Sequence, residues 1–483
     1  MNYKMVAHTL GTVLLAYAGL LLLPLVTGII FGENVLSFAA AAALSAGLGL
    51  LLRSFKIKSR AIYAEEGFVS VGLAWILMSL IGAIPFVIGG DIPKYVDAVF
   101  ETASGLSTTG ASVVTNIEGM TKSGLFWRSF THWIGGMGML VFIMAVMPKG
   151  DEHSMHIMRA EVPGPVVSKL VPKVRSTAVI LYLIYTALTV LETIFLMLGG
   201  MSFFESLLQA FSTAGTGGFC TRSAGVLDFG SAYIEVVLSI FMMLFGVNFN
   251  LYFLILIGRA KEAFKNEELH WYLAILATAT LAIAVGIRDS CGSFGAAVRT
   301  AFFNVNAIVS TTGYTHSDFT QWPAYTQAII VALMFVGGCA GSTGGGMKLS
   351  RIMLLIKSAK ADVIGVIHPR RVTRPRLEGK CVDSGTVRAV YSYAVLFMLV
   401  LLLSTLIVSF DGYDFGTCFT ASLSCLSNVG PGLNLVGPMG SYNIFSDGIK
   451  AWMSLLMIFG RLEMYPILML FVPATWKRKK SAE

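Results

Sequence analysis

The chain has 483 residues, of which 55% are hydrophobic and only 13% are charged. A water-soluble protein of this length would need a more polar surface than this composition supplies. Apolar runs recur from residue 8 to residue 472, and no polar stretch between them is long enough to form a separate soluble domain. The composition therefore predicts one membrane domain and excludes an ordinary soluble fold.

The net charge of +8 is distributed unevenly. Of the 35 Lys and Arg residues, 27 lie at Lys4 or within residues 53–60, 149–175, 259–265, 348–388 and 477–480. The positive-inside rule assigns these segments to the cytoplasm, which places both termini there. The intervening outer loops are acidic, so the basic excess predicts topology and gives no support for nucleic-acid binding.

The remaining composition argues against bound metals and a cleaved leader. The six cysteines are scattered, with no CxxC pair and no histidine spacing typical of zinc. The first apolar run, residues 6–31, is too long for a signal-peptide core, so we expect it to remain as a membrane helix. We predict no cofactor.

Apolar stretches of membrane-spanning length are predicted at residues 8–31, 35–52, 67–89, 123–147, 176–199, 231–258, 270–287, 323–357, 388–410 and 447–472. Shorter apolar segments lie between certain spans, at residues 98–112, 203–219, 298–314 and 418–432. Each follows an outward-going span and precedes an inward-going one. We therefore predict four re-entrant loops that enter and leave on the outer side.

Every short segment runs into a tetrapeptide that contains small or hydroxyl-bearing residues and ends in glycine. The first is Ser107, Thr108, Thr109 and Gly110, the second Ala214, Gly215, Thr216 and Gly217, the third Ser310, Thr311, Thr312 and Gly313, and the fourth Ser427, Asn428, Val429 and Gly430. Such regular recurrence predicts an internal repeat of span, half-helix, loop and span.

The predicted fold is an all-α membrane protein with four such M1-P-M2 repeats around one pseudo-fourfold pore, preceded by two extra transmembrane helices. The extra helices occupy residues 1–60, and the repeats occupy residues 61–150, 151–262, 263–365 and 366–483. Non-helical backbone at membrane depth must line an aqueous path or be buried in protein. Four tetrapeptides sharing one axis would offer neutral oxygens to a dehydrated monovalent cation. The alternative is close helix packing, which also enriches Gly, Ser and Thr.

Taken in order, the motifs Ser-Thr-Thr-Gly, Thr-Gly-Gly-Phe, Ser-Thr-Thr-Gly-Tyr and Ser-Asn-Val-Gly-Pro-Gly resemble the filter segments of the TrkH/TrkG/KtrB superfamily of potassium transporters. The two leading spans resemble the TrkH branch. The resemblance implies potassium binding at the four tetrapeptides, a bacterial plasma (inner) membrane location, a homodimer and a cytosolic nucleotide-binding partner of the TrkA type. The match is uneven at Gly215, Asn428 and Val429, so we expect less strict selectivity than in a symmetric channel.

The eighth span is interrupted by a glycine-rich run in which a continuous helix is improbable. By resemblance, this run gates the pore, and its glycines are Gly337, Gly338, Gly341, Gly344, Gly345 and Gly346. A packing kink is the alternative. No GxxxxGK[ST] pattern is present, so the run does not predict a phosphate-binding loop.

Arg461 lies within the last span, where an unpaired guanidinium facing lipid would be costly. The resemblance implies a positive charge beneath the filter that slows cation passage, and the alternative is an ion pair with Glu463. His132 is interpreted mainly as a packed side chain, with a proton-relay role as the alternative.

No catalytic constellation is recognisable, so an enzyme is not predicted. The favoured function is uptake of potassium, with rubidium also accepted, through a gated pore driven by the membrane potential. Two alternatives remain: a proton- or sodium-coupled symporter, and a membrane subunit of an ATP-driven pump.

Overall fold

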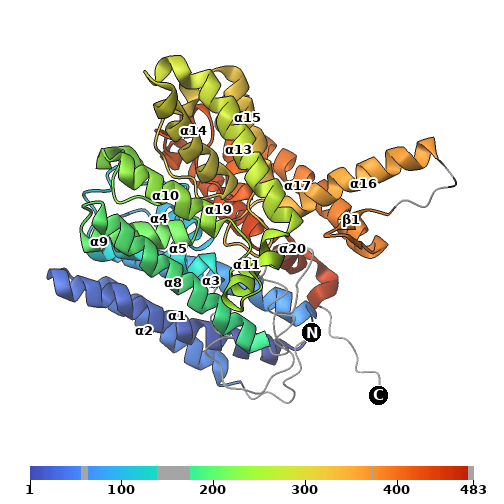
Figure 1. The fold of residues 1–483 in the computed structure, drawn as a ribbon. Coiled ribbons are helices and arrows are strands. Elements are labelled where there is room, and N and C mark those ends of the chain that lie inside the picture. The colour runs from blue at the N-terminus through green and yellow to red at the C-terminus, as the bar shows by residue number, and fades with distance from the viewer. Residues whose placement is uncertain (56–63, 139–173, 369, 371–373, 477–483) are drawn as a thin grey trace, which may run out of the picture.

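The computed structural model describes residues 1–55, 64–138, 174–368, 370 and 374–476. These residues are folded mostly into helices, as predicted, and Figure 1 shows the helices gathered into one body from which a helical arm projects. The predicted basic segments 149–175 and 477–480, and the end of the predicted span 123–147, lie largely or wholly outside the described residues.

The two leading helices, α1 (Tyr3–Phe31) and α2 (Leu36–Arg53), form an antiparallel pair. Their backbones approach so closely that a Cβ atom added at Gly11 would lie 2.6 Å from the carbonyl oxygen of Gly49. The pair packs against the first repeat, where the hydroxyl of Tyr17 donates to the Met78 carbonyl at 3.0 Å. The extra pair therefore covers one side of the body.

The rest of the chain repeats one pattern four times: an outer helix, a short pore helix and an inner helix. The outer helices are α3 (Ala64–Gly89), α8 (Val174–Leu198), α13 (Glu267–Ile287) and α17 (Ser384–Val408). The pore helices are α4 (Tyr95–Leu106), α9 (Phe203–Ala214), α14 (Phe294–Val309) and α18 (Phe415–Ser427). The inner helices are α5 (Lys122–Gly136), α10 (Ala232–Phe245) with α11 (Phe249–Leu256), α15 (Ala324–Val336) with α16 (Leu349–Ile367), and α19 (Asp447–Arg461) with α20 (Tyr465–Phe471).

The four repeats close into a ring. Within each repeat the outer helix packs on its own pore helix, and each inner helix packs on the pore helix of the next repeat: α5 on α9, α10 on α14, α15 on α18, and α19 on α4. The last of these contacts joins the fourth repeat to the first. This cyclic packing places the four pore helices around one common axis.

The inner helices differ from the continuous spans predicted at 231–258 and 447–472. The second is broken after Phe245, and α10 and α11 are bent by 89° at the break. The fourth is broken between Arg461 and Tyr465, where Glu463 and Met464 both have positive φ. The break predicted in the third repeat is present at residues 337–348, but inner-helix breaks are therefore not confined to that repeat.

The remaining elements are short. Strands β1 (Arg376–Leu377) and β2 (Lys380–Cys381) form an antiparallel hairpin after α16, and α12 (Ala260–Phe264) joins the second and third repeats. Short 3-10 helices cover Gly225–Phe229, Arg288–Ser290, Phe319–Gln321, Ser409–Asp411, Asn434–Val436, Tyr442–Ile444 and Pro473–Trp476.

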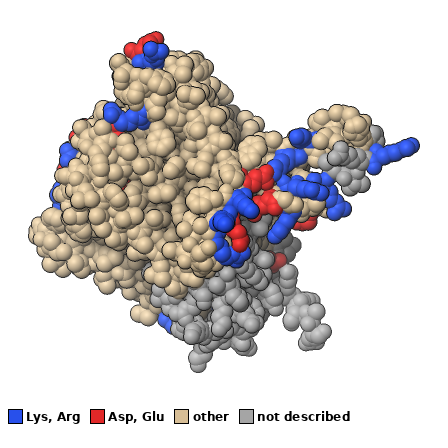
Figure 2. Space-filling view, viewed as in Figure 1, with Lys and Arg blue, Asp and Glu red and all other residues tan. Residues whose placement is uncertain are grey.

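The surface agrees with a membrane location. Among the described residues, six helices are long and apolar enough to cross a bilayer, and the bent pair α10–α11 makes a seventh. Large apolar side chains such as Leu198, Leu256 and Leu402 are exposed on this body, as expected where lipid is the solvent. Figure 2 shows Lys and Arg gathered on the projecting arm formed by α16 and the hairpin, whereas the broad face of the body is mostly uncharged.

Candidate cation-binding site

The four pore helices end at the ring axis in the same backbone conformation. One residue near each C-terminus has a positive φ: Thr108 at 57°, Thr216 at 53°, Thr311 at 60° and Asn428 at 55°. Two residues later, in each repeat, a glycine has positive φ: Gly110, Gly218, Gly313 and Gly430. A left-handed conformation costs a β-branched residue free energy, so its recurrence at three threonines indicates a constraint shared by the repeats.

These glycines form a closed ring with their neighbours' carbonyl oxygens. A Cβ atom added at Gly110 would lie 1.9 Å from the carbonyl oxygen of Gly217, and one added at Gly218 would lie 2.0 Å from that of Thr312. A Cβ atom added at Gly313 would lie 1.7 Å from the carbonyl oxygen of Val429, and one added at Gly430 would lie 2.7 Å from that of Thr109. Each glycine therefore faces the third residue of the next repeat, and the fourth repeat closes on the first. No side chain fits at this ring without displacing a backbone carbonyl.

The ring fixes the register of the four loop segments, which we call the axial segments: residues 107–110, 215–218, 310–313 and 427–430. The predicted second segment, Ala214 to Gly217, is displaced by one residue, because Ala214 is the last residue of α9. The correction aligns Thr216 with Thr108 and Thr311. The glycine at position 215 therefore replaces a serine of the other repeats, not a threonine. Gly218 was missed, although the Gly-Gly pair signals it.

The axial segments are held from behind by their own pore helices. The backbone N–H groups of Thr109, Gly217 and Val429 donate to carbonyls five residues earlier, at 2.8 to 2.9 Å. The hydroxyls of Ser107 and Thr109 are 2.7 Å apart, and those of Ser310 and Thr312 are also 2.7 Å apart. These bonds within the first and third segments fix side chains that face away from lipid.

The side chains at the positive-φ position are not equivalent. The Thr108 hydroxyl is buried and has no hydrogen-bond partner among the described residues, whereas the Thr311 hydroxyl accepts the Gly345 N–H at 2.6 Å. Asn428 donates from Nδ2 to the Thr109 hydroxyl at 3.0 Å and to the Met457 carbonyl at 2.8 Å. An amide in the fourth repeat thus braces the first.

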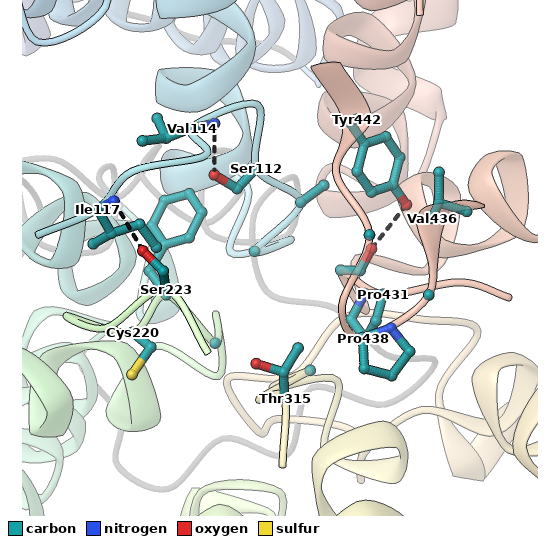
Figure 3. A pocket seen from close by; sticks show the side chains of 18 of the residues that line it. Ser112, Val114, Ile117, Cys220, Ser223, Thr315, Pro431, Val436, Pro438 and Tyr442 are labelled. Atoms are coloured by element: carbon teal, nitrogen blue, oxygen red, sulfur yellow. Dashed lines mark hydrogen bonds between the residues drawn. The ribbon is translucent and has the colours of Figure 1, made fainter. Parts of the chain in front are cut away.

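A cavity of about 100 Å³ opens directly outside the ring and is lined by all four terminal glycines. Figure 3 shows its walls contributed by all four repeats, with Tyr442 and Pro431 on one side and Ser223 and Cys220 on another. The Tyr442 hydroxyl donates to the Gly430 carbonyl at 2.8 Å, which fixes the outer end of the fourth segment. The cavity connects the ring with the surface.

A carboxylate, Glu118, is hydrogen-bonded to Ser223, one of the residues that line this cavity. The Ser223 hydroxyl accepts the N–H of Ile117 at 3.1 Å, and Glu118 accepts from the side chain and backbone of Ser223. The hydrogen bonds from Ser223 lower the pKa of Glu118, whose side chain is exposed. Glu118 is therefore ionised at neutral pH beside the cavity mouth, in keeping with the predicted acidic outer face.

A buried ion pair braces the first and second segments, and sequence reasoning missed it. Arg128 on α5 pairs with Glu101 on α4, and it also donates to the Cys220 carbonyl at 2.9 Å. Its guanidinium lies 3.7 Å from the centre of the Phe219 ring. Glu101 in turn accepts the N–H of Val113 at 3.1 Å. The sequence signal for this ion pair was the presence of an arginine and a glutamate within two segments that were predicted to be apolar helices.

The glycine-rich run forms a buried loop beneath the ring, which we call the glycine loop (residues 337–348). A Cβ atom added at Gly344 would lie 2.8 Å from the Ser310 carbonyl oxygen, and one added at Gly345 would lie 2.7 Å from the Asn428 side chain. Gly337, Gly341 and Gly346 have positive φ, and Gly338 accepts the Leu349 N–H at 3.1 Å. All six predicted glycines therefore lie in a loop packed against the third and fourth axial segments.

Arg461 lies at the end of α19 and is buried. Its guanidinium donates to the carbonyls of Thr343 in the glycine loop at 2.7 Å, and of Gly135 and Gly136 at 2.5 and 2.6 Å. The alternative pairing with Glu463 is not formed, because Glu463 makes a bidentate pair with Arg351 at 2.5 and 2.8 Å. Arg461 thus joins the first, third and fourth repeats below the ring.

His132 is packed behind the second segment. Its ring stacks on Phe219 with centroids 4.2 Å apart, and an added Cβ atom at Gly217 would overlap it. Asn248 caps α11 by accepting the Asn250 N–H at 3.0 Å. The His132 contacts agree with the packing interpretation, and among the described residues no cluster of His, Cys, Asp and Glu has a metal-binding arrangement.

Comparisons with known proteins agree with this architecture. The profile of the family described as TrkH, cation transport protein, matches residues 33–287 and 290–478. The Trk system potassium uptake protein TrkH of Salmonella typhimurium is 31% identical over 99% of this chain and 100% of its own length. The Trk system potassium uptake protein TrkG of Escherichia coli is 30% identical over 99% of each chain. The crystal structure of the potassium transporter TrkH from Vibrio parahaemolyticus superposes with a TM-score of 0.89, 28% identity and coverage of 99% and 100%.

The family match, the full-length relatives and the fourfold architecture exclude an enzyme assignment and confirm the resemblance noted in the sequence. Because both the sequence match and the shared fold extend over nearly the whole chain, the chain belongs to the TrkH family of cation transport proteins.

Proposed function

We propose that this chain takes up potassium across the bacterial plasma (inner) membrane, with both termini in the cytoplasm. The observation that carries the proposal is the closed ring in which four glycines face four carbonyl oxygens of neighbouring repeats. Four converging, uncharged segments suit a dehydrated monovalent cation, because carbonyl oxygens replace its water shell without requiring fixed charge. The relatives named Trk system potassium uptake proteins support potassium as the cation.

The proposed site comprises the four axial segments, with Gly218 in place of Ala214. The negative ends of four pore helices point toward the axis and favour a cation there. Rubidium, which has nearly the size and charge of potassium, should pass by the same route. The driving force is the membrane potential, worth about 2.3 kcal/mol per charge per 100 mV.

We further propose that the glycine loop closes the path below the ring and that Arg461 opposes cation passage there. The loop blocks this level by packing against Ser310 and Asn428, and Arg461 places a positive charge beside it. Opening requires the loop to leave the axial segments. A cytosolic nucleotide-binding subunit of the TrkA type is the proposed regulator, and a homodimer is the proposed assembly.

Growth of an uptake-deficient bacterium on limiting potassium tests the function. The unmodified chain, produced together with its regulator, should restore growth, whereas Gly313→Ala should not, because its Cβ atom would overlap the Val429 carbonyl. Gly19→Ala is the matched control, since an added Cβ atom there meets no atom within 4 Å. Failure of the unmodified chain to restore growth would count against potassium uptake.

A further inference from the structure

Two consecutive glutamates at the start of α13 contact different parts of the third repeat. Glu268 is buried, whereas the Glu267 side chain is 30% exposed. Both lie at the end of the outer helix that faces the projecting arm (Figure 1). Neither residue belongs to the ring or its outer cavity.

Glu268 contacts both the glycine loop and the first turn of α16 through one oxygen atom. Its Oε1 accepts the N–H of Ala340 at 2.7 Å and the N–H of Ser350 at 3.1 Å. Ser350 lies in the first turn of α16, where backbone N–H groups have no partner within the helix. The residue before α16 is Lys348, which provides no side-chain cap. Glu268 therefore supplies, from another helix, the side-chain oxygen that caps α16.

Glu267 holds the arm. It forms an ion pair with Lys357 on α16, and its Oε2 accepts the N–H of Glu378 in the hairpin turn at 3.0 Å. Lys357 also donates to the Arg376 carbonyl at 2.8 Å, and Asn266 donates to the Glu378 carboxylate. The turn of the hairpin is thus attached to the start of α13.

The inner end of this series reaches the axial segments. Gly345 of the glycine loop donates its N–H to the Thr311 hydroxyl at 2.6 Å. A path of hydrogen bonds and covalent backbone therefore runs from the hairpin to Glu267, along α13 to Glu268, across to Ala340, along the glycine loop to Gly345, and on to Thr311 of the third segment.

We propose that Glu267 and Glu268 couple the position of the hairpin to the position of the glycine loop. The inference rests on the gating role proposed above and names the residues that transmit regulation to it. With the hairpin attached, Glu268 holds Ala340 and Ser350 and the loop stays against the ring. Displacing the hairpin rotates the end of α13, lengthens these bonds and releases the loop. Glu268 is a positioning residue, since it acts on the pore only through the loop.

Tracer rubidium flux through purified full-length chain in proteoliposomes, without regulator, measures the effect. Glu268→Ala removes the hydrogen bonds to Ala340 and Ser350 and should raise flux at least about fivefold, because the loss of even one hydrogen bond of ordinary net strength from the closed state gives that ratio. Glu268→Gln keeps an oxygen that can accept both N–H groups, so its flux should stay near that of the unmodified chain. Glu262→Ala, at an exposed glutamate on α12, is the matched control.

The double variant tests coupling. Glu267→Ala should raise flux alone but add nothing in a Glu268→Ala background, because both act on the same contact. Additive effects, or equal effects of Glu268→Ala and Glu268→Gln, would overturn the proposal. Deleting residues 340–345 distinguishes a failure of the coupling from a failure of the gate. If the deletion raises flux and the glutamate variants do not, the proposed coupling is wrong while the proposed gate stands. If the deletion also leaves flux unchanged, the proposed gate itself fails.

A cross-link keeps the test independent of folding in the alanine variants. Cysteines at Asn266 and Glu378, in a Cys381→Ser background, would be joined by a short reducible thiol linker after reconstitution. The linker should lower regulator-stimulated flux about fivefold, and reduction should restore it, because the hairpin can then leave α13. Stimulated flux that is equal with linked and free hairpin contradicts the coupling.

Discussion

Arg128 and Glu101 form an ion pair of 2.6 Å just behind the outer end of the ring, with side-chain exposures of 3% and 0%. The pair joins the inner helix of the first repeat to its pore helix, and through the Cys220 carbonyl it reaches the second repeat. Two adjacent segments therefore share one brace, and their spacing depends on a buried charge pair in a membrane protein that has few charges.

Neutralising one partner should destabilise the fold and widen the ring. Glu101→Gln leaves the Arg128 guanidinium buried without its carboxylate, and breaking such pairs typically costs about 3–5 kcal/mol. We expect a lower thermal midpoint in detergent and, in the fraction that folds, a lower ratio of potassium to sodium flux. Arg259→Ala breaks an exposed pair with Glu262 and should change neither quantity appreciably. An unchanged ratio of potassium to sodium flux in Glu101→Gln would show that the Arg128–Glu101 pair does not contribute to selectivity.

The register of the second axial segment gives another prediction. Gly218→Ala introduces a Cβ atom 2.0 Å from the Thr312 carbonyl at a φ of 81°, and such a conformation alone costs a non-glycine residue about 1–3 kcal/mol. We expect potassium uptake in the rescue strain to fall about tenfold. Gly47→Ala, where an added Cβ atom meets no atom within 4 Å, should grow like the unmodified strain. Normal uptake by Gly218→Ala would favour the register that begins at Ala214.

Replacing Arg461 by Gln should raise tracer potassium flux about tenfold, because removing ~1.4 kcal/mol of electrostatic barrier already gives that ratio. Glu463→Gln is the discriminating control, since Glu463 pairs with Arg351 and not with Arg461. It should lower stability while leaving the flux per folded molecule nearly unchanged. If Arg461→Gln and the unmodified chain have equal flux, Arg461 does not slow cation passage, and its role is the structural one of its hydrogen bonds with Thr343, Gly135 and Gly136.

A prediction for Asn428 follows from its contacts across repeats. Asn428→Ala removes the hydrogen bonds that Nδ2 donates to the Thr109 hydroxyl and to the Met457 carbonyl, each worth about 0.5–1.5 kcal/mol. We expect a reduced potassium-to-sodium flux ratio, because the first and fourth segments lose their link. Asn434→Ala, at a donor to Asp414 distant from the ring, provides a matched asparagine control. If the potassium-to-sodium flux ratio falls in Asn434→Ala but not in Asn428→Ala, Asn428 does not have the proposed role of linking the first and fourth segments.

The repeat architecture was predictable from sequence because length and hydropathy encode it directly. The short segments before Gly110, Gly313 and Gly430 are too brief to cross a bilayer, and six glycines cannot sustain a helix at 337–346. These local properties do not depend on what packs around them, so the half-helices and the glycine loop lie where they were expected.

The features missed depend on tertiary contacts. Gly246 and Asn248 mark the break between Phe245 and Phe249 in the sequence, but the bend is supported by backbone hydrogen bonds to the glycine loop. The Phe249 N–H donates to the Gly341 carbonyl and the Cys339 N–H to the Gly246 carbonyl, both at 3.0 Å. The register of the second segment is likewise set by the neighbouring Thr312 carbonyl. Pairing of Glu463 with Arg351, 112 residues away, could not be read from helical spacing.

The most direct test of the central claim is tracer potassium uptake by purified full-length chain in proteoliposomes, with the glycine loop released by deletion of residues 340–345. A potassium gradient and voltage alone, with sodium absent and no proton gradient, should drive uptake that Gly313→Ala abolishes. Uptake that requires a sodium or proton gradient, or that persists unchanged in Gly313→Ala, would contradict a passive path through the four-glycine ring.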